Sequence, residues 1–143
     1  KGKVTDFVMN DKCAAGTGRF IEMMAQSLQL SLEEISRCGL RWHENISISS
    51  MCSVFAQSEV VSLIASDKKI EDIVHGINNS IASKIISLCK RGKLEKEFMM
   101  TGGVARNIGV VHAVEEKLGT KIIVPEEPDI CGALGASLIA LES

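Results

Sequence analysis

The chain has 143 residues, enough for one domain with its own hydrophobic core. A net charge of −2 with scattered lysines and an aromatic content of 3% provide neither a basic face nor base-stacking side chains, which argues against nucleic acid as a partner. No membrane partner is expected either, because no apolar run is long enough to cross a bilayer and no signal peptide opens the sequence.

Strand and helix patterns alternate through the first half of the chain. The predicted elements are a strand at 4–9, helices at 16–29 and 32–38, a short strand at 46–49 and a helix at 54–65. The second helix has the most explicit boundaries, since Ser31 and Glu34 form a capping-box pattern before it and Gly39 follows it.

The second half begins with the strongest helix pattern of the chain. Isoleucine, valine and leucine recur every three or four residues over 70–90, which predicts a long helix with one apolar face. A strand at 97–100, a helix at 107–118, a strand at 121–124 and a helix at 128–141 follow. This alternation predicts a mostly parallel sheet with helices on its faces, and ligands bind such sheets where strands lead into helices.

A first glycine cluster, Gly16-Thr17-Gly18, lies at one strand-to-helix transition. Glycines let the backbone approach a ligand closely, and the free N–H groups at the start of the following helix suit phosphate. Thr17 can add a hydroxyl, and Asp11 can supply a carboxylate to Mg²⁺ or to its waters. A tight turn capped by Asp11 is the alternative interpretation.

A second cluster, Gly102-Gly103-Val104, precedes a helix that Asn107 can cap. A flat ring could lie against this side-chain-free backbone, while a plain glycine turn with an Asn N-cap explains the same residues.

A third group of small residues, Gly132, Gly135 and Ala136, falls on one face of the last predicted helix. Small side chains let neighbouring helices approach closely. Packing is therefore favoured over ligand binding at this face.

Cys13 and Cys52 both precede predicted helices, where partial positive charge favours thiolate and metal ligation. Two ligands are half of a four-thiolate site, so a soft metal centre shared across a two-fold axis is one hypothesis. A zinc site with two further ligands is another, although CxxC pairs are lacking. Cys38, Cys89 and Cys131 are expected to be packing residues. Five irregularly spaced cysteines favour a reducing compartment, and we expect a cytoplasmic location.

Four segments resemble the iron–sulfur activator ATPases of 2-hydroxyacyl-CoA dehydratases, a family that also includes the ATPase subunits of ATP-dependent benzoyl-CoA reductases. They are residues 11–20, 50–60, 101–107 and 132–136, in the family's order and with natural spacing. The decapeptide that contains Cys13 is the most specific of them.

The resemblance implies an α/β fold of the actin/Hsp70/sugar-kinase (ribonuclease H-like) class, in which two similar halves clamp ATP. Residues 1–143 would form a single domain, the second half, with the first lobe absent from this chain, so hydrolysis by this chain alone is not expected. The implied nucleotide contacts are Gly16, Thr17 and Gly18 in the second phosphate loop and Gly102, Gly103, Val104 and Asn107 in the adenosine motif. Asp11 is the candidate catalytic residue, with Mg²⁺ as its ion.

The resemblance also implies that Cys13 and Cys52 from each of two subunits hold one [4Fe–4S] cluster in a homodimer. A donor such as ferredoxin or flavodoxin would reduce the cluster, and ATP would drive electron transfer to the dehydratase or reductase component. Two alternatives remain open: a small-molecule kinase of the same fold superfamily with structural cysteines, and a non-catalytic domain that binds a partner through its Gly/Ala helix and a loop bearing Trp42.

Overall fold

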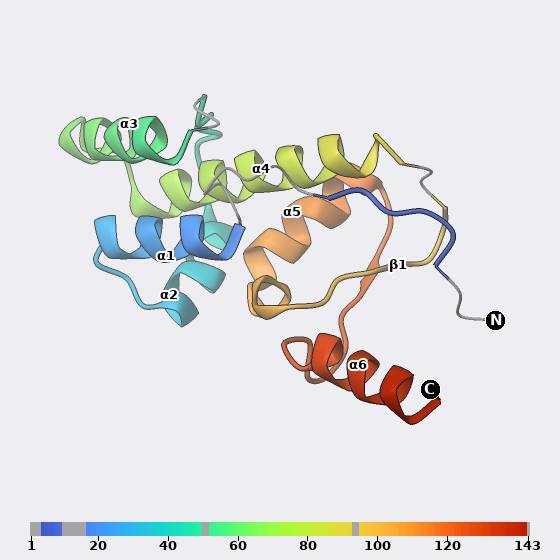
Figure 1. The fold of residues 1–143 in the computed structure, drawn as a ribbon. Coiled ribbons are helices and arrows are strands. Elements are labelled where there is room, and N and C mark those ends of the chain that lie inside the picture. The colour runs from blue at the N-terminus through green and yellow to red at the C-terminus, as the bar shows by residue number, and fades with distance from the viewer. Residues whose placement is uncertain (1–3, 10–16, 50–51, 93–94, 143) are drawn as a thin grey trace.

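The computed structural model describes residues 4–9, 17–49, 52–92 and 95–142. Several of its helices pack against one long helix, while the last helix stands apart from them (Figure 1). The elements in chain order are α1 (Thr17–Ser27), α2 (Leu32–Cys38), the 3-10 helix η1 (Gly39–Arg41), α3 (Ser53–Ala65), α4 (Ile70–Cys89), β1 (Phe98–Met99), the 3-10 helix η2 (Gly103–Arg106), α5 (Ile108–Leu118), β2 (Ile122–Ile123) and α6 (Cys131–Glu142).

The core is built on α4, the helix expected over 70–90. Ile73, Val74 and Ile77 are at most 1% exposed, as the apolar spacing predicts. Both α5 and η1 pack against this helix. The far end of the same core is closed by α1 and α3, which contact each other. Helices α1 to α4 therefore form one packed body. Helix α5, which follows α4 in the sequence, packs onto this body.

The sheet within the described residues is one parallel pair. Phe98 of β1 is in register with Ile122 of β2, and the Met100 N–H donates to the Ile123 carbonyl at 2.9 Å. The parallel direction confirms the βα alternation, because α5 forms the crossover between the two strands. Each strand is two residues long, shorter than expected over 97–100 and 121–124.

Two predicted strands are wrong. Residues 4–9 do not form a strand, because no other described segment pairs with their backbone. Their side chains are exposed, and Phe7 is 75% exposed. Residues 46–49 form no ladder either, although the expected alternation is present: Ile46 and Ile48 are buried against the helices and Ser47 is exposed. Apolar alternation identified the buried face of this segment, but strand pairing requires a neighbour that the local sequence does not specify.

The helix ends follow their capping signals. The Glu34 N–H donates to Ser31 Oγ at 3.1 Å, and the Ser31 N–H donates to the Glu34 carboxylate at 2.8 Å, which lowers the pKa of Glu34. Gly119 ends α5 at a φ of 67°, the left-handed conformation that favours glycine. α1 is shorter than the predicted 16–29, and α6 begins at Cys131 rather than 128. None of the helices in the described segments is long and apolar enough to span a membrane.

Candidate functional site

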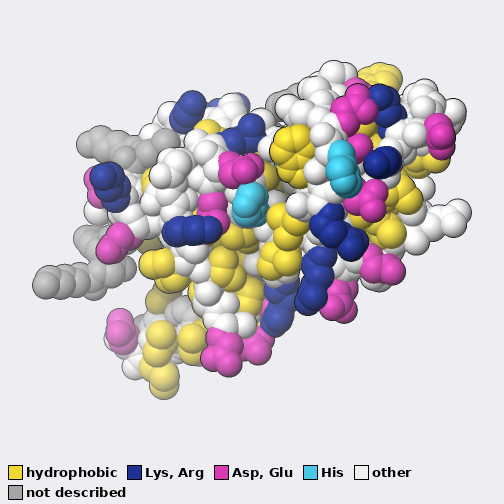
Figure 2. Space-filling model, turned by 180° about the vertical axis from the view of Figure 1, so that it is seen from behind, with side chains coloured by type: hydrophobic (Ala, Val, Ile, Leu, Met, Phe, Trp, Pro, Cys, Tyr) yellow, Lys and Arg dark blue, Asp and Glu magenta, His cyan; other side chains and the backbone are white. Residues whose placement is uncertain are grey.

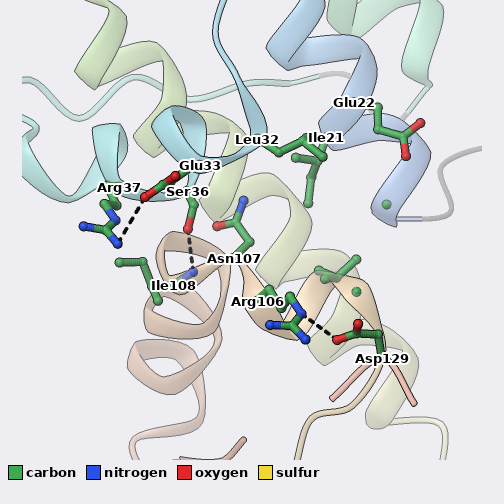
Figure 3. Close-up of a pocket in the computed structure, with 13 residues that line it drawn as sticks. Ile21, Glu22, Leu32, Glu33, Ser36, Arg37, Arg106, Asn107, Ile108 and Asp129 are labelled. Atoms are coloured by element: carbon green, nitrogen blue, oxygen red, sulfur yellow. Dashed lines mark hydrogen bonds and ion pairs between the residues drawn. The ribbon is translucent and has the colours of Figure 1, made fainter. Parts of the chain in front are cut away.

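A cavity of about 740 Å³ opens between the start of α1, one face of α2, the η2 segment and Asp129 (Figure 3). Its volume lies in the range of roughly 300–1,000 Å³ that is usual for sites of small ligands and cofactors. The walls combine apolar side chains such as Ile21 and Leu32 with the polar side chains of Ser36 and Asn107. A flat apolar group with polar substituents would match this lining.

The cavity unites the first two glycine clusters, which are more than eighty residues apart in sequence. Gly18 and Gly103 both line it, and a Cβ added at Gly18 would lie 3.7 Å from Cγ2 of Val104. A Cβ at Gly103 would meet nothing within 4 Å, so the glycine there leaves room for a ligand. Gly102, beside it, has a φ of 87°, a conformation that other residues rarely adopt.

Asn107 lines the cavity and also caps α5. Its side-chain Oδ1 accepts a hydrogen bond from the Val110 N–H at 3.0 Å, and the residue is 7% exposed. The N-cap expected from the sequence is therefore confirmed. Since an amide has two further N–H donors, the cap leaves donor capacity on the same side chain.

Ser36 joins the two walls of the cavity. Its Oγ accepts the Ile108 N–H at 2.9 Å, so α2 is tied to the start of α5 (Figure 3). Together with Asn107, this bond satisfies two of the N–H groups that a helix start leaves without intrahelical partners. The hydroxyl hydrogen of Ser36 is not used in this bond and can be donated to a ligand.

The face of α2 that meets the cavity was not predicted from the sequence. Glu33, Ser36 and Arg37 follow one another at i, i+3 and i+4, which places them on one side of the helix. Arg37 Nη2 lies 3.4 Å from Glu33 Oε1. Helical spacing could have grouped these residues, but nothing in the sequence shows which element the group faces.

Arg106 forms a clamp at the cavity rim that sequence reasoning also missed. Its Nε lies 2.6 Å from Asp129 Oδ1, and its Nη2 lies 2.5 Å from Glu127 Oε2. The hydrogen bond from Arg106 holds the pKa of Asp129 below its usual value, and the two carboxylates raise that of Arg106. The clamp fixes the segment before α6 against the η2 segment.

The remaining predicted site residues lie elsewhere. Asp11, Cys13 and Gly16 fall outside the described residues. Thr17 is the first residue of α1, next to Gly18 but not in the cavity lining. Cys52 occupies the N-cap of α3, is exposed, and does not line the cavity.

The other cysteines only partly follow expectation. Cys38 is buried, and burial raises the pKa of its thiol, which suits a packing residue. Cys89 is exposed and Cys131 is half-buried, so the packing role predicted for Cys89 is wrong. In the described part of the chain, no three His, Cys, Asp or Glu side chains gather into a group that could hold a metal. Trp42 stacks on His75 with ring centroids 4.2 Å apart.

A parallel α/β unit with a cavity between two glycine-containing helix starts defines a ligand-binding lobe. Residues 1–140 match the BadF/BadG/BcrA/BcrD ATPase family. The chain is 47% identical over 141 residues to the 2-hydroxyisocaproyl-CoA dehydratase activator of Clostridioides difficile, covering 99% of this chain and 53% of that protein. It is 48% identical over 143 residues to the activator of lactoyl-CoA dehydratase of Anaerotignum propionicum, covering 100% and 55%.

A solved structure agrees with these relatives. The activator of the 2-hydroxyisocaproyl-CoA dehydratase from Clostridium difficile with bound ADPNP superposes with a TM-score of 0.93 at 47% identity, covering 99% of this chain and 53% of that one. The chain belongs to the BadF/BadG/BcrA/BcrD ATPase family and has the actin/sugar-kinase-like nucleotide-binding fold. It spans about half the length of the curated relatives it matches.

Proposed function

We propose that the chain is the second nucleotide-binding half of an ATP-dependent activator of a 2-hydroxyacyl-CoA dehydratase or a related reductase component. The observation that carries this proposal is the cavity that joins Gly18 to Gly103 and Asn107 in a chain of this family. The similarity to an activator with bound ADPNP supports an adenine nucleotide as the ligand.

In the proposed site the nucleoside lies in the cavity and the phosphates lie near the start of α1. Ile21, Leu32 and Val104 offer apolar surface to the base, and the open space over Gly103 lets it approach the backbone. Ser36 and Asn107 have donor hydrogens for polar atoms of the nucleoside. The N–H groups at the start of α1 suit phosphate.

At the phosphate end, Gly16 and Thr17 complete the phosphate loop with Gly18. Asp11 is the proposed catalytic carboxylate, and it would bind Mg²⁺ or the waters of that ion, which would supply charge stabilisation to the phosphates. Because the first phosphate loop belongs to the other half of this fold, we propose hydrolysis for the two-lobed protein only.

The metal site of the proposal uses Cys13 and Cys52 of each protomer in a homodimer. Four thiolates are the ligand set of a [4Fe–4S] cluster, and such a cluster supplies a one-electron carrier of low potential. The exposure of Cys52 at the N-cap of α3 supports this role, since a cluster ligand at a subunit boundary must be reached from outside the protomer. The proposed electron donor is a ferredoxin or flavodoxin.

The nucleotide site is tested in a full-length chimera, in which this chain replaces the matching half of the C. difficile activator. Gly103→Val fills the space over the glycine, and we expect ADPNP affinity, measured by calorimetry, to fall at least about tenfold, because a base excluded from contact loses one to two kcal/mol of burial. Thr120→Val puts the same side chain at an exposed position outside the cavity and should leave affinity unchanged. Equal affinities for the two variants would refute the assignment of the cavity.

A further inference from the structure

A smaller cavity, of about 290 Å³, lies where α4, α5 and η1 meet. The larger side chains that line it are Leu40, Trp42, His75, Asn78, His112 and Glu116. On the face of the molecule shown in Figure 2, histidine side chains lie beside hydrophobic and acidic ones. This cavity shares no lining residue with the nucleotide cavity, although Ile108 of one and Gly109 of the other are consecutive.

The Asn78 side chain gives this cavity a polar floor. Asn78 is 3% exposed, and its side-chain amide makes no hydrogen bond to any residue in the described segments. Every fully covered side-chain nitrogen and oxygen in those segments has a partner, so the unpaired amide of Asn78 reaches the space that it lines. Because a buried amide without a partner is unfavourable, its position points to a polar ligand.

Two glycines make room for this amide. A Cβ added at Gly39 would lie 2.9 Å from Asn78 Nδ2, and one added at Gly109 would lie 2.5 Å from the same atom. A side chain at either position would therefore displace the amide. The backbones of η1 and α5 hold the floor of the cavity from two sides.

Trp42 gives the cavity a flat apolar wall. Its ring stacks on that of His75, with centroids 4.2 Å apart and planes inclined by 16°. The His75 ring is itself held, because it donates to the Gly39 carbonyl and its Nε2 lies 2.8 Å from Asn79 Nδ2. Burial lowers the pKa of His75, which favours the neutral ring. Trp42 is 44% exposed, so this fixed indole still offers surface to a ligand.

The charge of the lining favours a cation. Glu116 is the acidic side chain among the described lining residues, and they include neither lysine nor arginine. The Glu116 carboxylate lies 3.8 Å from His112 Nδ1, beyond ordinary hydrogen-bond distance, and its side chain is 57% exposed. The carboxylate therefore has acceptor capacity for a ligand inside the cavity.

We propose that this cavity binds the guanidinium group of an arginine. A guanidinium is planar, positively charged and has only donors, so it can stack on Trp42 while its N–H groups donate to Glu116 and to Oδ1 of Asn78. An ammonium group would match the charge but not the flat wall. The volume suits one side chain better than a whole nucleotide or cofactor. The arginine can be the free amino acid or a residue on the surface of another protein.

Tryptophan fluorescence of the 143-residue chain tests the proposal, because Trp42 is its only tryptophan and the chain has no tyrosine. The probe is Nα-acetyl-arginine amide, and we expect a saturable change in emission in the millimolar range, as for a ligand of a few atoms. The neutral citrulline analogue should bind at least about tenfold more weakly, since it lacks the charge. The lysine analogue should bind at least about threefold more weakly, since it lacks the planar fork.

Substitutions identify the groups that bind the probe. Glu116→Gln should weaken binding of the arginine probe at least about tenfold, because it removes the charge of the acceptor. Glu126→Gln is the matched control, since Glu126 is exposed and lies outside the cavity lining. Asn78→Leu keeps the size of the side chain without the amide, and it should weaken binding at least about threefold.

The outcomes separate the two sources of the guanidinium group. Tighter binding of the capped arginine than of free L-arginine would support an arginine carried by a protein, and binding of free L-arginine at least as tight would support the amino acid itself. The absence of a saturable change up to about 50 mM would refute the site. Equal binding of the arginine and citrulline probes would also refute it, as would equal affinities of Glu116→Gln and Glu126→Gln.

Discussion

Removing the Ser36 hydroxyl tests whether the bond across the cavity holds its walls together. Ser36→Ala leaves the Ile108 N–H without its partner at 2.9 Å. An unsatisfied buried donor costs about 1–3 kcal/mol, and since Ile108 is itself half-exposed we expect the lower end, about 1 kcal/mol. For a chain of this length that corresponds to a fall in Tm of about 3–5 °C.

The neighbouring cap gives a second measurement of the same helix start. Asn107→Ala removes the acceptor of the Val110 N–H, which should cost about 1 kcal/mol, whereas Asn107→Asp keeps an acceptor oxygen and should retain most of the stability. Because Ser36 and Asn107 accept from the Ile108 and Val110 N–H groups in the same helix turn, their double-mutant cycle should show a coupling of about 0.5 kcal/mol or more.

Urea unfolding of the 143-residue chain is the assay, and Ser62→Ala is the control. The Ser62 hydroxyl donates to the Ser58 carbonyl on an exposed helix surface, so its loss leaves no orphaned group and should change stability by less than about 0.5 kcal/mol. If Ser36→Ala were as stable as Ser62→Ala, the bond to Ile108 would not hold the walls, and the cavity geometry would need another cause.

Two further predictions concern stability in the same assay. Two backbone N–H groups donate to the Asp72 carboxylate and lower its pKa below the ordinary 3.8, so its contribution is complete above pH 3.8 and is lost as pH falls towards the lower folded-state pKa. Asp72→Asn should therefore destabilise the chain at pH 7 and progressively less as the pH falls below 3.8. A deficit independent of pH, or one matched by Asp67→Asn, would contradict this. Ile77→Ala, at a side chain 1% exposed, should cost about 2–5 kcal/mol, and Ile139→Ala on α6 less than about 0.5; similar losses would show that α6 is packed in the isolated chain.

Local signals in the sequence predicted the helices well. The capping box at Ser31, the N-cap at Asn107 and the glycine stop at Gly119 act within a few residues, so the chain itself specifies them. The stripe along α4 was equally explicit, because burial of one face follows from its spacing. These features need no knowledge of distant segments.

Features that depend on distant partners were not predicted. The strand expected at 4–9 has no paired neighbour among the described residues, and the cavity face of α2 was not foreseen. The clamp of Arg106 on Asp129 joins residues 23 positions apart, with α5 and β2 between them. The two glycine clusters were identified separately, and only the fold shows that Gly18 and Val104 come into contact range.

Iron content after anaerobic purification of the chimera tests the central proposal most directly, with Cys52→Ser compared against Cys89→Ser. Both cysteines are exposed, but only Cys52 is a proposed ligand. We predict about four irons and four sulfides per dimer in the parent and in Cys89→Ser, and loss of that iron in Cys52→Ser. A chimera that stays colourless after reconstitution would contradict the electron-transfer account, and so would iron retained in Cys52→Ser. A colourless protein that still binds ADPNP would favour a kinase with structural cysteines.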